Sequence, residues 1–477
     1  MNKSLGKNAV LNVIKTAMSV IFPLITFPYV SNVLGVEELG KYNFSNSINS
    51  YFLMIAALGI SSYAVREGAA IRDDRNKFSK FATEILELNL LSMLIAYILY
   101  GVCIVAIPKL QNYLIYLLIF SVEIFFSTVG VEWIYIIFEE YTYITIRRIA
   151  FQVISMILLF TLVKTRGDLL RYCAITVCAD AGANLLNIAN VRKYADIEFS
   201  VTVNLRRHIS PVMIIFASTL AIKVYTSSDT VMLGFVSGDY AVGLYSVAAK
   251  VYNVLKPLIS AVTVVSIPRL AAYAGTGSMK EYQKLLRDIY LILFVVALPA
   301  IVGLFMLSDN VIVFISNTDY LGATWALRFL SLAVIFSVFS SFYNQCVLIP
   351  MKMEKDFLVA TIVSAGANII LNFLLIPLYS HNGAALATMI SELISLICCY
   401  WASKKVVCLG GVFHAMRTSA VSCIGIILAC IITKSVLKSN VLCIICSIFV
   451  SVLIYAVSIL IQKNEVALFM IDKLKKG

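Results

Sequence analysis

Charged side chains are scarce in this chain, where they make up 13% of the 477 residues. Soluble domains carry about 25% charged residues, so the composition excludes a soluble protein and a soluble domain of any size. Hydrophobic residues make up 61%. Apolar stretches of about 20 residues recur from one end to the other, without the period-2 alternation of strands, and each can span a bilayer as a helix.

Catalytic and metal-binding motifs are also missing. The three histidines are scattered at loop edges, and the eleven cysteines lie in apolar runs without metal-ligand spacing. The GxxxxGK[ST] motif is absent, which excludes a built-in ATPase of that type. No predicted outside loop exceeds about a dozen residues, too few for the exposed catalytic loop of a membrane glycosyltransferase or polymerase. We therefore expect no enzyme, no cofactor and no metal site.

The net charge of +12 reflects topology rather than nucleic-acid binding, because the basic residues form no patch with interleaved aromatics. Of the 38 Lys and Arg residues, 26 fall on one side of the predicted spans and 7 on the other. The positive-inside rule then predicts that both termini are cytoplasmic and that the number of spans is even. MNKSLGK at the N-terminus leads into an apolar segment without an A-x-A site, so we expect a first span rather than a cleavable signal.

The predicted fold is an all-α polytopic membrane protein with about fourteen transmembrane helices. The predicted spans are 8–34, 42–64, 81–106, 113–138, 149–163, 170–191, 211–236, 241–266, 288–308, 322–349, 357–376, 383–402, 418–437 and 441–461.

Two segments suggest an internal repeat. LGVEELGKY (34–42) joins spans 1 and 2, and LGFVSGDYAVGLY (233–245) joins spans 7 and 8. Each begins with Leu-Gly and closes with Gly-x-Tyr. The offset of about 200 residues covers six spans, an even number, which predicts a parallel repeat about the membrane normal. The predicted division is a first six-helix bundle (1–191), a cytoplasmic linker (192–210), a second bundle (211–402) and a trailing helix pair with a tail (403–477).

The strongest functional signal is charge inside the spans. Lys223 lies near the middle of the apolar stretch from Pro211 to Val236, and Lys250 lies deep in the next one. A charge at that depth costs about 3 kcal/mol on insertion scales and usually faces a bundle interior or a wet cavity. With the polar residues at helical spacing beside them, we expect a cavity lined by Lys15, Lys223, Lys250, Lys256, Arg328, Asn12, Asn46, Thr226 and Asn253.

Acidic residues in the spans have separate expected roles. Asp180 and Glu392 occupy corresponding depths in spans 6 and 12, where either could bind a proton or a coupling cation; Asp229 and Glu123 are further candidates for coupling or ion pairing. Three alternatives stay open. The hydroxyls and amides could join helices to one another, Lys223 could form a structural ion pair with Asp229 or with a carboxylate of another span, and Lys256 and Arg328 could snorkel to the interfaces.

Deep cations favour an anionic cargo. Lysine binds phosphate as a point charge, so a phosphate or pyrophosphate group that leaves the headgroup region could bind in such a cavity. Rows of hydroxyls and amides would suit a sugar-bearing cargo.

Four segments resemble bacterial polysaccharide flippases of the Wzx type, in the MATE-like multidrug/oligosaccharidyl-lipid/polysaccharide exporter superfamily. They are FPYVSNVLGVEELGKYNFSNSI (27–48), SSYAVREGAAIRDD (61–74), DTVMLGFVSGDYAVGLYSVAAKV (229–251) and NIILNFLLIPLYSHNGAALATMISE (368–392). The resemblance implies two six-helix bundles arranged as a V, plus an extra helix pair, in a bacterial cytoplasmic membrane.

The resemblance also implies the activity. The cargo would be an oligosaccharide repeat unit on undecaprenyl pyrophosphate, moved to the outer leaflet by alternating access for O-antigen, capsule or a related polysaccharide. A polysaccharide polymerase and a chain-length regulator would be partners, and an H⁺ or Na⁺ gradient could drive the step. The alternatives are a multidrug or organic-cation antiporter of the same superfamily and a flippase for peptidoglycan or teichoic-acid precursors. The deep lysines argue against the first of these.

Overall fold

The computed structural model describes residues 5–197, 206–407 and 409–468, with side chains described from residue 18 onward except at 19, 20 and 206. Every regular element in these ranges is helical. The α-helices are α1 (Leu5–Ala57), α2 (Ile60–Ala69), α3 (Arg75–Ala106), α4 (Pro108–Gln111), α5 (Leu114–Val129), α6 (Glu132–Ile137), α7 (Tyr141–Leu162), α8 (Leu169–Asn190), α9 (Arg206–Ser237), α10 (Asp239–Thr276), α11 (Met279–Met306), α12 (Ser308–Ile315), α13 (Thr324–Tyr343), α14 (Glu354–Ser403), α15 (Phe413–Val436) and α16 (Asn440–Ile461). The short elements are the 3₁₀ turns η1 (Arg166–Asp168), η2 (Val191–Lys193) and η3 (Thr318–Ala323) and the π-helical turn η4 (Asn344–Leu348).

The chain is a multi-pass membrane protein. Within the described ranges, 11 helical segments are long and apolar enough to cross a membrane, and α5 is a shorter apolar helix. Two long helices are interrupted: α1 has a non-helical residue at Gly35 and α14 has one at Ser380. The loops expected at 35–41 and 377–382 are therefore single-residue breaks between helices. The all-helical membrane fold is confirmed, and the count of about fourteen spans stays a prediction.

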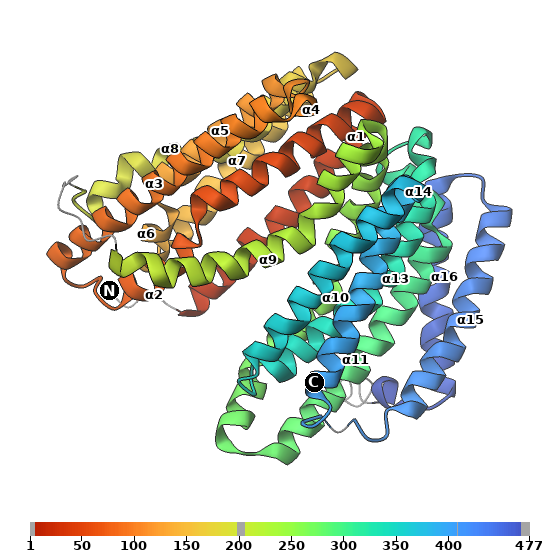
Figure 1. Cartoon of the computed structure of the whole chain (residues 1–477). Coiled ribbons are helices and arrows are strands. Elements are labelled where there is room, and N and C mark those ends of the chain that lie inside the picture. Colours follow the sequence, from red (N-terminus) through yellow and green to blue (C-terminus); the bar gives the residue numbers. More distant parts are fainter. Residues whose placement is uncertain (1–4, 198–205, 408, 469–477) are drawn as a thin grey trace. The chain divides into compact units, whose positions relative to one another are not determined.

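The chain forms two compact units, Met1–Gly243 and Leu244–Gly477. In the first unit (red to yellow-green in Figure 1), α1 packs against α3, α5, α7 and α9, while α8 packs against α5 and α7. An aromatic core joins α2, α3 and α6 at one end of this unit, with Phe78, Phe81, Trp133 and Tyr135 among its buried residues. The division predicted at 192–210 stays a prediction.

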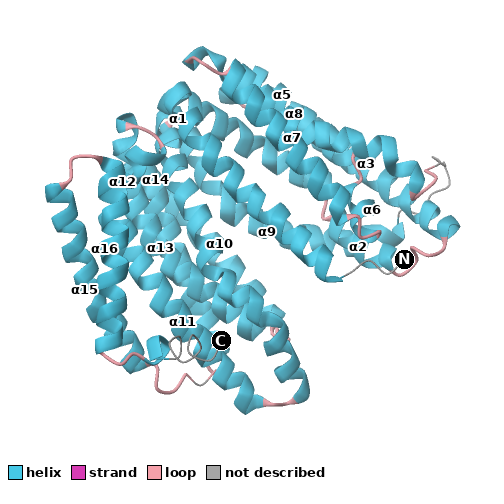
Figure 2. Cartoon of the chain, turned by 180° about the vertical axis from the view of Figure 1, so that it is seen from behind, coloured by secondary structure: helices cyan, strands magenta, loops and turns pink. Residues whose placement is uncertain are grey.

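The second unit is built on the pair α13 and α14, to which α11 adds on the α13 side. The trailing helices α15 and α16 pack against each other, and α15 packs against α11 (Figure 2). The Tyr455 hydroxyl of α16 donates to the Val295 carbonyl of α11 at 2.9 Å. The predicted trailing pair is thus attached to α11 through a buried cluster that includes Leu291, Val295 and Tyr455.

Two glycines with positive φ mark equivalent points of the suspected repeat. Gly35 has a φ of 78° at the break in α1, and Gly238 has a φ of 83° between α9 and α10. The matching segments fit at two offsets: Leu-Gly at 34–35 matches 233–234, 199 residues on, and Gly-x-Tyr at 40–42 matches 243–245, 203 residues on. Gly234 lies inside α9, where a Cβ would overlap the ring of Phe44. The positive-φ positions Gly35 and Gly238 fit the offset of 203 residues, and the repeat itself stays a prediction.

The two matching segments contact each other reciprocally. A Cβ on Gly40 would overlap the backbone carbonyl of Asp239, and a Cβ on Gly243 would overlap the backbone carbonyl of Val36. At the offset of 203 residues, Gly40 corresponds to Gly243 and Val36 corresponds to Asp239. Each Gly-x-Tyr motif therefore places a glycine where only a residue without a side chain lets the other copy's backbone approach.

Side chains beside this corner hold it in place. The Lys109 ammonium donates to the carbonyls of Gly234 and Phe235, at 2.5 and 3.1 Å, near the C-terminus of α9. The Tyr113 hydroxyl donates to Asp239 Oδ1 at 2.5 Å. Burial and this carboxylate raise the pKa of Tyr113, so the phenol keeps its proton.

Arg147 on α7 is a deeply buried cation of the first unit, with 3% of its side chain exposed. Its Nη2 donates to Glu132 Oε2 at 3.0 Å, and the guanidinium lies 5.6 Å from the centre of the Tyr143 ring. A guanidinium so far from water requires this carboxylate.

Alanine at Gly40 or Gly243 should destabilise the protein, because the added methyl group meets a backbone carbonyl that cannot rotate away. Overpacking of this kind costs about 1–3 kcal/mol. We expect a lower apparent melting temperature of the detergent-purified protein for each variant. Gly101→Ala and Gly303→Ala are matched controls, since no atom lies within 4 Å of either Cβ and both positions are helical. Equal melting temperatures for all four variants would contradict the close contact.

Glu132→Gln should destabilise the protein more than the double substitution Glu132→Gln/Arg147→Met. The single change leaves the buried guanidinium without a carboxylate, which costs about 3–5 kcal/mol for a fully buried pair, and the double change removes the charge altogether. The half-life of the monodisperse protein at a fixed elevated temperature measures the difference. A double variant that decays as fast as the single one would show that the loss is in packing and not in charge.

Candidate functional site

Lys223 and Glu123 come together in the first unit. Lys223 lies on α9 and Glu123 on α5, and the two charges interact across the helices. The Asn49 side chain of α1 is fully buried, and its Nδ2 donates to Glu123 Oε2 at 3.2 Å. Glu123 is thus a carboxylate of another span with which Lys223 interacts, and an ion pair of Lys223 stays a prediction.

Glu123 also belongs to a row of acidic side chains. Asp180 on α8 interacts electrostatically with Glu123, with Arg148 of α7 and with Glu132 of α6. Asp180 lies at an exposed position of α8. Two of the four acidic candidates from the sequence, Asp180 and Glu123, thus interact with each other. Asp180 also interacts with Glu132, the ion-pair partner of Arg147.

The other predicted residues of the first unit are more dispersed. Asp229 on α9 is 5% exposed and interacts with the Tyr51 phenol of α1. Asn46 is half-buried on α1, and Thr226 is exposed on α9. Lys15 and Asn12 lie outside the residues whose side chains are described.

Glu392, Lys256 and Tyr252 form the corresponding cluster of the second unit. Glu392 Oε1 accepts a hydrogen bond from the Tyr252 hydroxyl at 2.6 Å and another from Lys256 Nζ at 3.1 Å. The Glu392 side chain is 5% exposed and that of Lys256 is 34% exposed. Snorkelling of Lys256 was one of the alternatives that the sequence left open. In the structure Lys256 of α10 forms an ion pair with Glu392 of α14; both helices are labelled in Figure 1.

Lys250, Asn253 and Lys256 follow one another at intervals of three residues along α10. This spacing places them along one side of the helix. Lys250 is half-buried, and Asn253 is exposed.

Arg328 on α13 is accommodated differently, by aromatic rings. Its guanidinium carbon lies 4.7 Å from the centre of the Trp325 ring and 5.6 Å from that of Phe305. Cation–π attraction of this kind stabilises a cation that is partly withdrawn from water. The role of Arg328 in a cavity stays a prediction.

Most hydroxyls of the polar rows bond within their own helix. They donate to the carbonyl four residues earlier, as in Thr219 to Ile215, Thr226 to Ile222, Thr388 to Ala384 and Ser391 to Ala387. Bonds across helices link Ser340 with Ser395 at 2.7 Å and Thr388 with the Tyr245 hydroxyl at 3.4 Å. Hydroxyls of these helices therefore both back-bond and join helices.

Reasoning from the sequence did not single out Tyr252, Asn368 or Asn372. Tyr252 donates to the deep carboxylate of Glu392. Asn368 and Asn372 of α14 are buried and joined by a hydrogen bond of 3.0 Å. The spacing of four residues between Tyr252 and Lys256, and again between the two asparagines, is the signal that could have found them.

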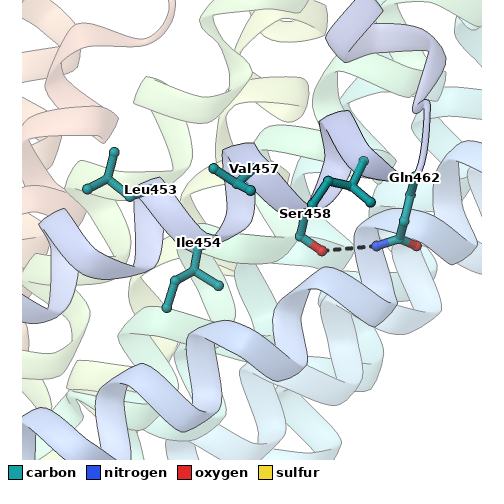
Figure 3. A pocket seen from close by; sticks show the side chains of 6 residues that line it. Leu453, Ile454, Val457, Ser458 and Gln462 are labelled. Carbon is teal, nitrogen blue, oxygen red and sulfur yellow. Dashed lines mark hydrogen bonds between the residues drawn. The ribbon is translucent and has the colours of Figure 1, made fainter.

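Two grooves on the described surface are lined by none of the predicted site residues. One lies along α16 and is lined by Leu453, Ile454, Val457, Ser458, Ile461 and Gln462. The Gln462 amide donates to the Ser458 hydroxyl at 3.0 Å (Figure 3). Another lies among α11, α13 and α14 and is lined mainly by aromatic rings. Apolar grooves on spanning helices suit lipid chains, so the candidate site rests on the charged clusters. Among the described residues, no group of three His, Cys, Asp or Glu could hold a metal ion.

Known proteins provide an independent comparison. A "Putative O-antigen transporter" of Escherichia coli (strain K12) is 23% identical over 397 residues, which cover 82% of this chain and 94% of that protein. The "Capsular polysaccharide biosynthesis protein CapF" of Staphylococcus aureus is 22% identical over 376 residues, covering 78% and 92%.

Solved structures agree on the fold. The lipid II flippase MurJ in an inward closed conformation matches with a TM-score of 0.78 at 18% identity, covering 94% of this chain and 98% of that one. An inward-facing MATE family multidrug resistance transporter matches with a TM-score of 0.55 at 12% identity, covering 81% and 98%. The family model described as polysaccharide biosynthesis protein matches residues 5–274, which is more than half of the chain. The chain therefore belongs to the polysaccharide biosynthesis protein family.

Proposed function

We propose that this protein is a flippase that moves undecaprenyl-pyrophosphate-linked oligosaccharide repeat units from the cytoplasmic to the outer leaflet of a bacterial cytoplasmic membrane. The units would enter O-antigen, capsule or a related surface polysaccharide. Membership of the polysaccharide biosynthesis family and the names of the two relatives support this cargo. The protein itself carries out no covalent chemistry in this proposal.

The observation that carries the proposal is the set of cations inside spanning helices. Lys223 and Lys250 bind the pyrophosphate, because an ammonium group attracts a multiply charged phosphate strongly where water is scarce. Lys15, Lys256 and Arg328 are further cations of the pathway. Asn12, Asn46, Thr226 and Asn253 offer amide and hydroxyl groups to the sugars.

The proposed mechanism is alternating access. Fourteen spans form two six-helix bundles (1–191 and 211–402) and a trailing pair (403–477), with both termini in the cytoplasm. The bundles rock about the linker 192–210, so that the cargo site opens first inward and then outward. The prenyl chain stays in the lipid throughout, because moving it through a polar pathway would cost about 0.8 kcal/mol per methylene group.

A coupling ion and two protein partners complete the proposal. Asp180 or Glu392 takes up H⁺ or Na⁺, with Glu123 and Asp229 as the neighbouring acids. A polysaccharide polymerase and a chain-length regulator receive the product. If collapse of the ion gradient leaves flipping unchanged, coupling is excluded.

A flippase of peptidoglycan or teichoic-acid precursors is the second candidate, favoured by the structural match to the lipid II flippase. Its cargo carries the same pyrophosphate, so the same cations would serve. A multidrug antiporter would have to bind organic cations beside buried lysines, which is electrostatically unfavourable.

Deletion of the gene in its native host should abolish one surface polysaccharide and leave its undecaprenyl-linked repeat unit at the cytoplasmic face. Synthesis of the repeat unit does not need the flippase, so the intermediate accumulates. Analysis of surface polymer and of lipid-linked oligosaccharide measures both effects. Unchanged polymer together with new drug sensitivity would favour the multidrug antiporter, and accumulated lipid II would favour the second candidate.

Lys223→Ala and Lys250→Ala should each abolish export, because each removes a cation for the pyrophosphate. Export of the polysaccharide in the deletion strain measures activity, and the amount of protein in the membrane measures folding. Lys223→Ala also leaves Glu123 without its cation, so the double variant Lys223→Ala/Glu123→Gln serves as a control that restores charge balance but not export. Full export by both single variants would contradict this assignment.

A further inference from the structure

The cluster of Glu392, Lys256 and Tyr252 presents its cation outward and its carboxylate inward. Both donors bond the same oxygen, Oε1, the hydroxyl at 2.6 Å and the ammonium at 3.1 Å. With 34% of the Lys256 side chain exposed against 5% of Glu392, the ammonium is the member of the pair that an approaching ligand meets first.

Lys256 has capacity for a second anion. An ammonium group carries three N–H donors. One is directed to Glu392, and another lies 3.4 Å from the Tyr252 oxygen. One donor is thus left for an oxygen that arrives from the exposed side, so the ammonium can contact a new ligand before it leaves Glu392.

Tyr252 makes that departure possible. When a buried carboxylate loses its only partner, the full free energy of its desolvation is left uncompensated. Glu392 keeps the short hydrogen bond from the Tyr252 hydroxyl after the ammonium has moved. The ion pair can therefore open without leaving an unbonded charge in the interior of the unit.

We propose that Glu392 is an internal counter-anion of the cargo site. It neutralises Lys256 when no cargo is bound, and the diphosphate group of the cargo displaces it. This inference rests on the proposed function, since it takes a prenyl diphosphate as the ligand of Lys256. The exchange breaks no covalent bond: the ammonium passes from a carboxylate to a diphosphate, and Glu392 stays on Tyr252. The contact between α10 and α14 then lacks its ion pair, so cargo binding changes how two helices hold together.

The first unit repeats the arrangement with other residues. Lys223 is accompanied by Glu123, and a neutral donor, the Asn49 amide, bonds that carboxylate at 3.2 Å. In each unit a lysine predicted to bind cargo thus interacts electrostatically with a carboxylate that also accepts a hydrogen bond from a neutral side chain. The occurrence of the same three kinds of group in both units supports an exchange mechanism.

Binding of undecaprenyl pyrophosphate to the purified full-length protein in nanodiscs tests the exchange. Glu392→Gln keeps an acceptor for Tyr252 but no longer competes for the ammonium, so we expect binding to tighten about ten- to a hundredfold, the factor for a hydrogen bond to a charged group. In a Lys256→Met background, Glu392→Gln should change nothing. Flipping by Glu392→Gln at saturating cargo should be slower than by the wild-type protein, because the cargo is no longer displaced by the carboxylate.

Glu465→Gln is the matched control. Glu465 lies in the same unit, pairs with Arg287 and is 44% exposed, so its removal alters net charge equally and should leave binding unchanged. If Glu392→Gln folds poorly, Glu392→Asp retains the charge while withdrawing it from Lys256, and a smaller tightening is expected.

The outcomes separate the two proposals. Binding by the wild-type protein with the same or weaker affinity in Glu392→Gln overturns the exchange and leaves the flippase proposal intact. Tightening that persists in the Lys256→Met background also overturns it, since the effect would not pass through that ammonium. Failure of every variant, Glu392→Gln included, to bind undecaprenyl pyrophosphate contradicts the proposed function and this inference with it.

Discussion

An ammonium group within hydrocarbon has no solvent, and the internal organisation of both units follows from that constraint. Lys223 on α9 interacts electrostatically with Glu123 on α5. Lys256 is matched by Glu392, which ties α10 to α14. The helix that carries an acidic residue is thereby favoured as the neighbour of the helix that carries the cation. A pathway for an anion can be kept in a membrane only if its cations are neutralised while it is empty.

Uncharged polar groups in the spanning helices can be satisfied by hydrogen bonds within their own helix. A threonine such as Thr226 donates to the carbonyl of Ile222 on its own helix and needs nothing from a neighbour. Arg328 lies against the rings of Trp325 and Phe305 rather than an acid. A carboxylate from another helix pairs with Lys256, with Arg147 and with Arg207, whose partner Glu84 is 4% exposed. This distribution concentrates the interactions between helices in a few charged contacts whose loss or exchange would change the packing.

Much of the fold could be predicted from composition and periodicity. Long apolar runs specify helices through local hydrogen bonding, and a deep lysine such as Lys223 is visible in the sequence because its neighbours are apolar. The partners could not be predicted, since Glu392 is 136 residues from Lys256 and Glu123 is 74 from Asn49. Nothing local distinguishes one acid of a span from another, and only the tertiary packing decides which one meets the cation.

Details of the backbone could not be predicted from the sequence, for a different reason. The break at Ser380 uses a φ of 51° in a residue other than glycine, which no propensity favours, so the sequence suggested a longer loop there. The Leu-Gly end of the match gives an offset of 199 residues and the Gly-x-Tyr end one of 203, because Gly234 and Gly238 look equally suitable for a turn. Only Gly238 has the positive φ, whereas Gly234 is required by the ring of Phe44. The sequence does not show whether a glycine is needed for a positive φ or because a neighbouring group leaves no room for a side chain.

The reciprocal contact of Gly40 with Asp239 and of Gly243 with Val36 has a consequence for substitution. When position i of one segment meets position j of the other, and j meets i in return, the contact is isologous, the form found in two-fold homodimers. In a homodimer a single substitution changes both contacts at once. In this single chain Gly40 and Gly243 are separate positions, so either contact can change while the other is kept.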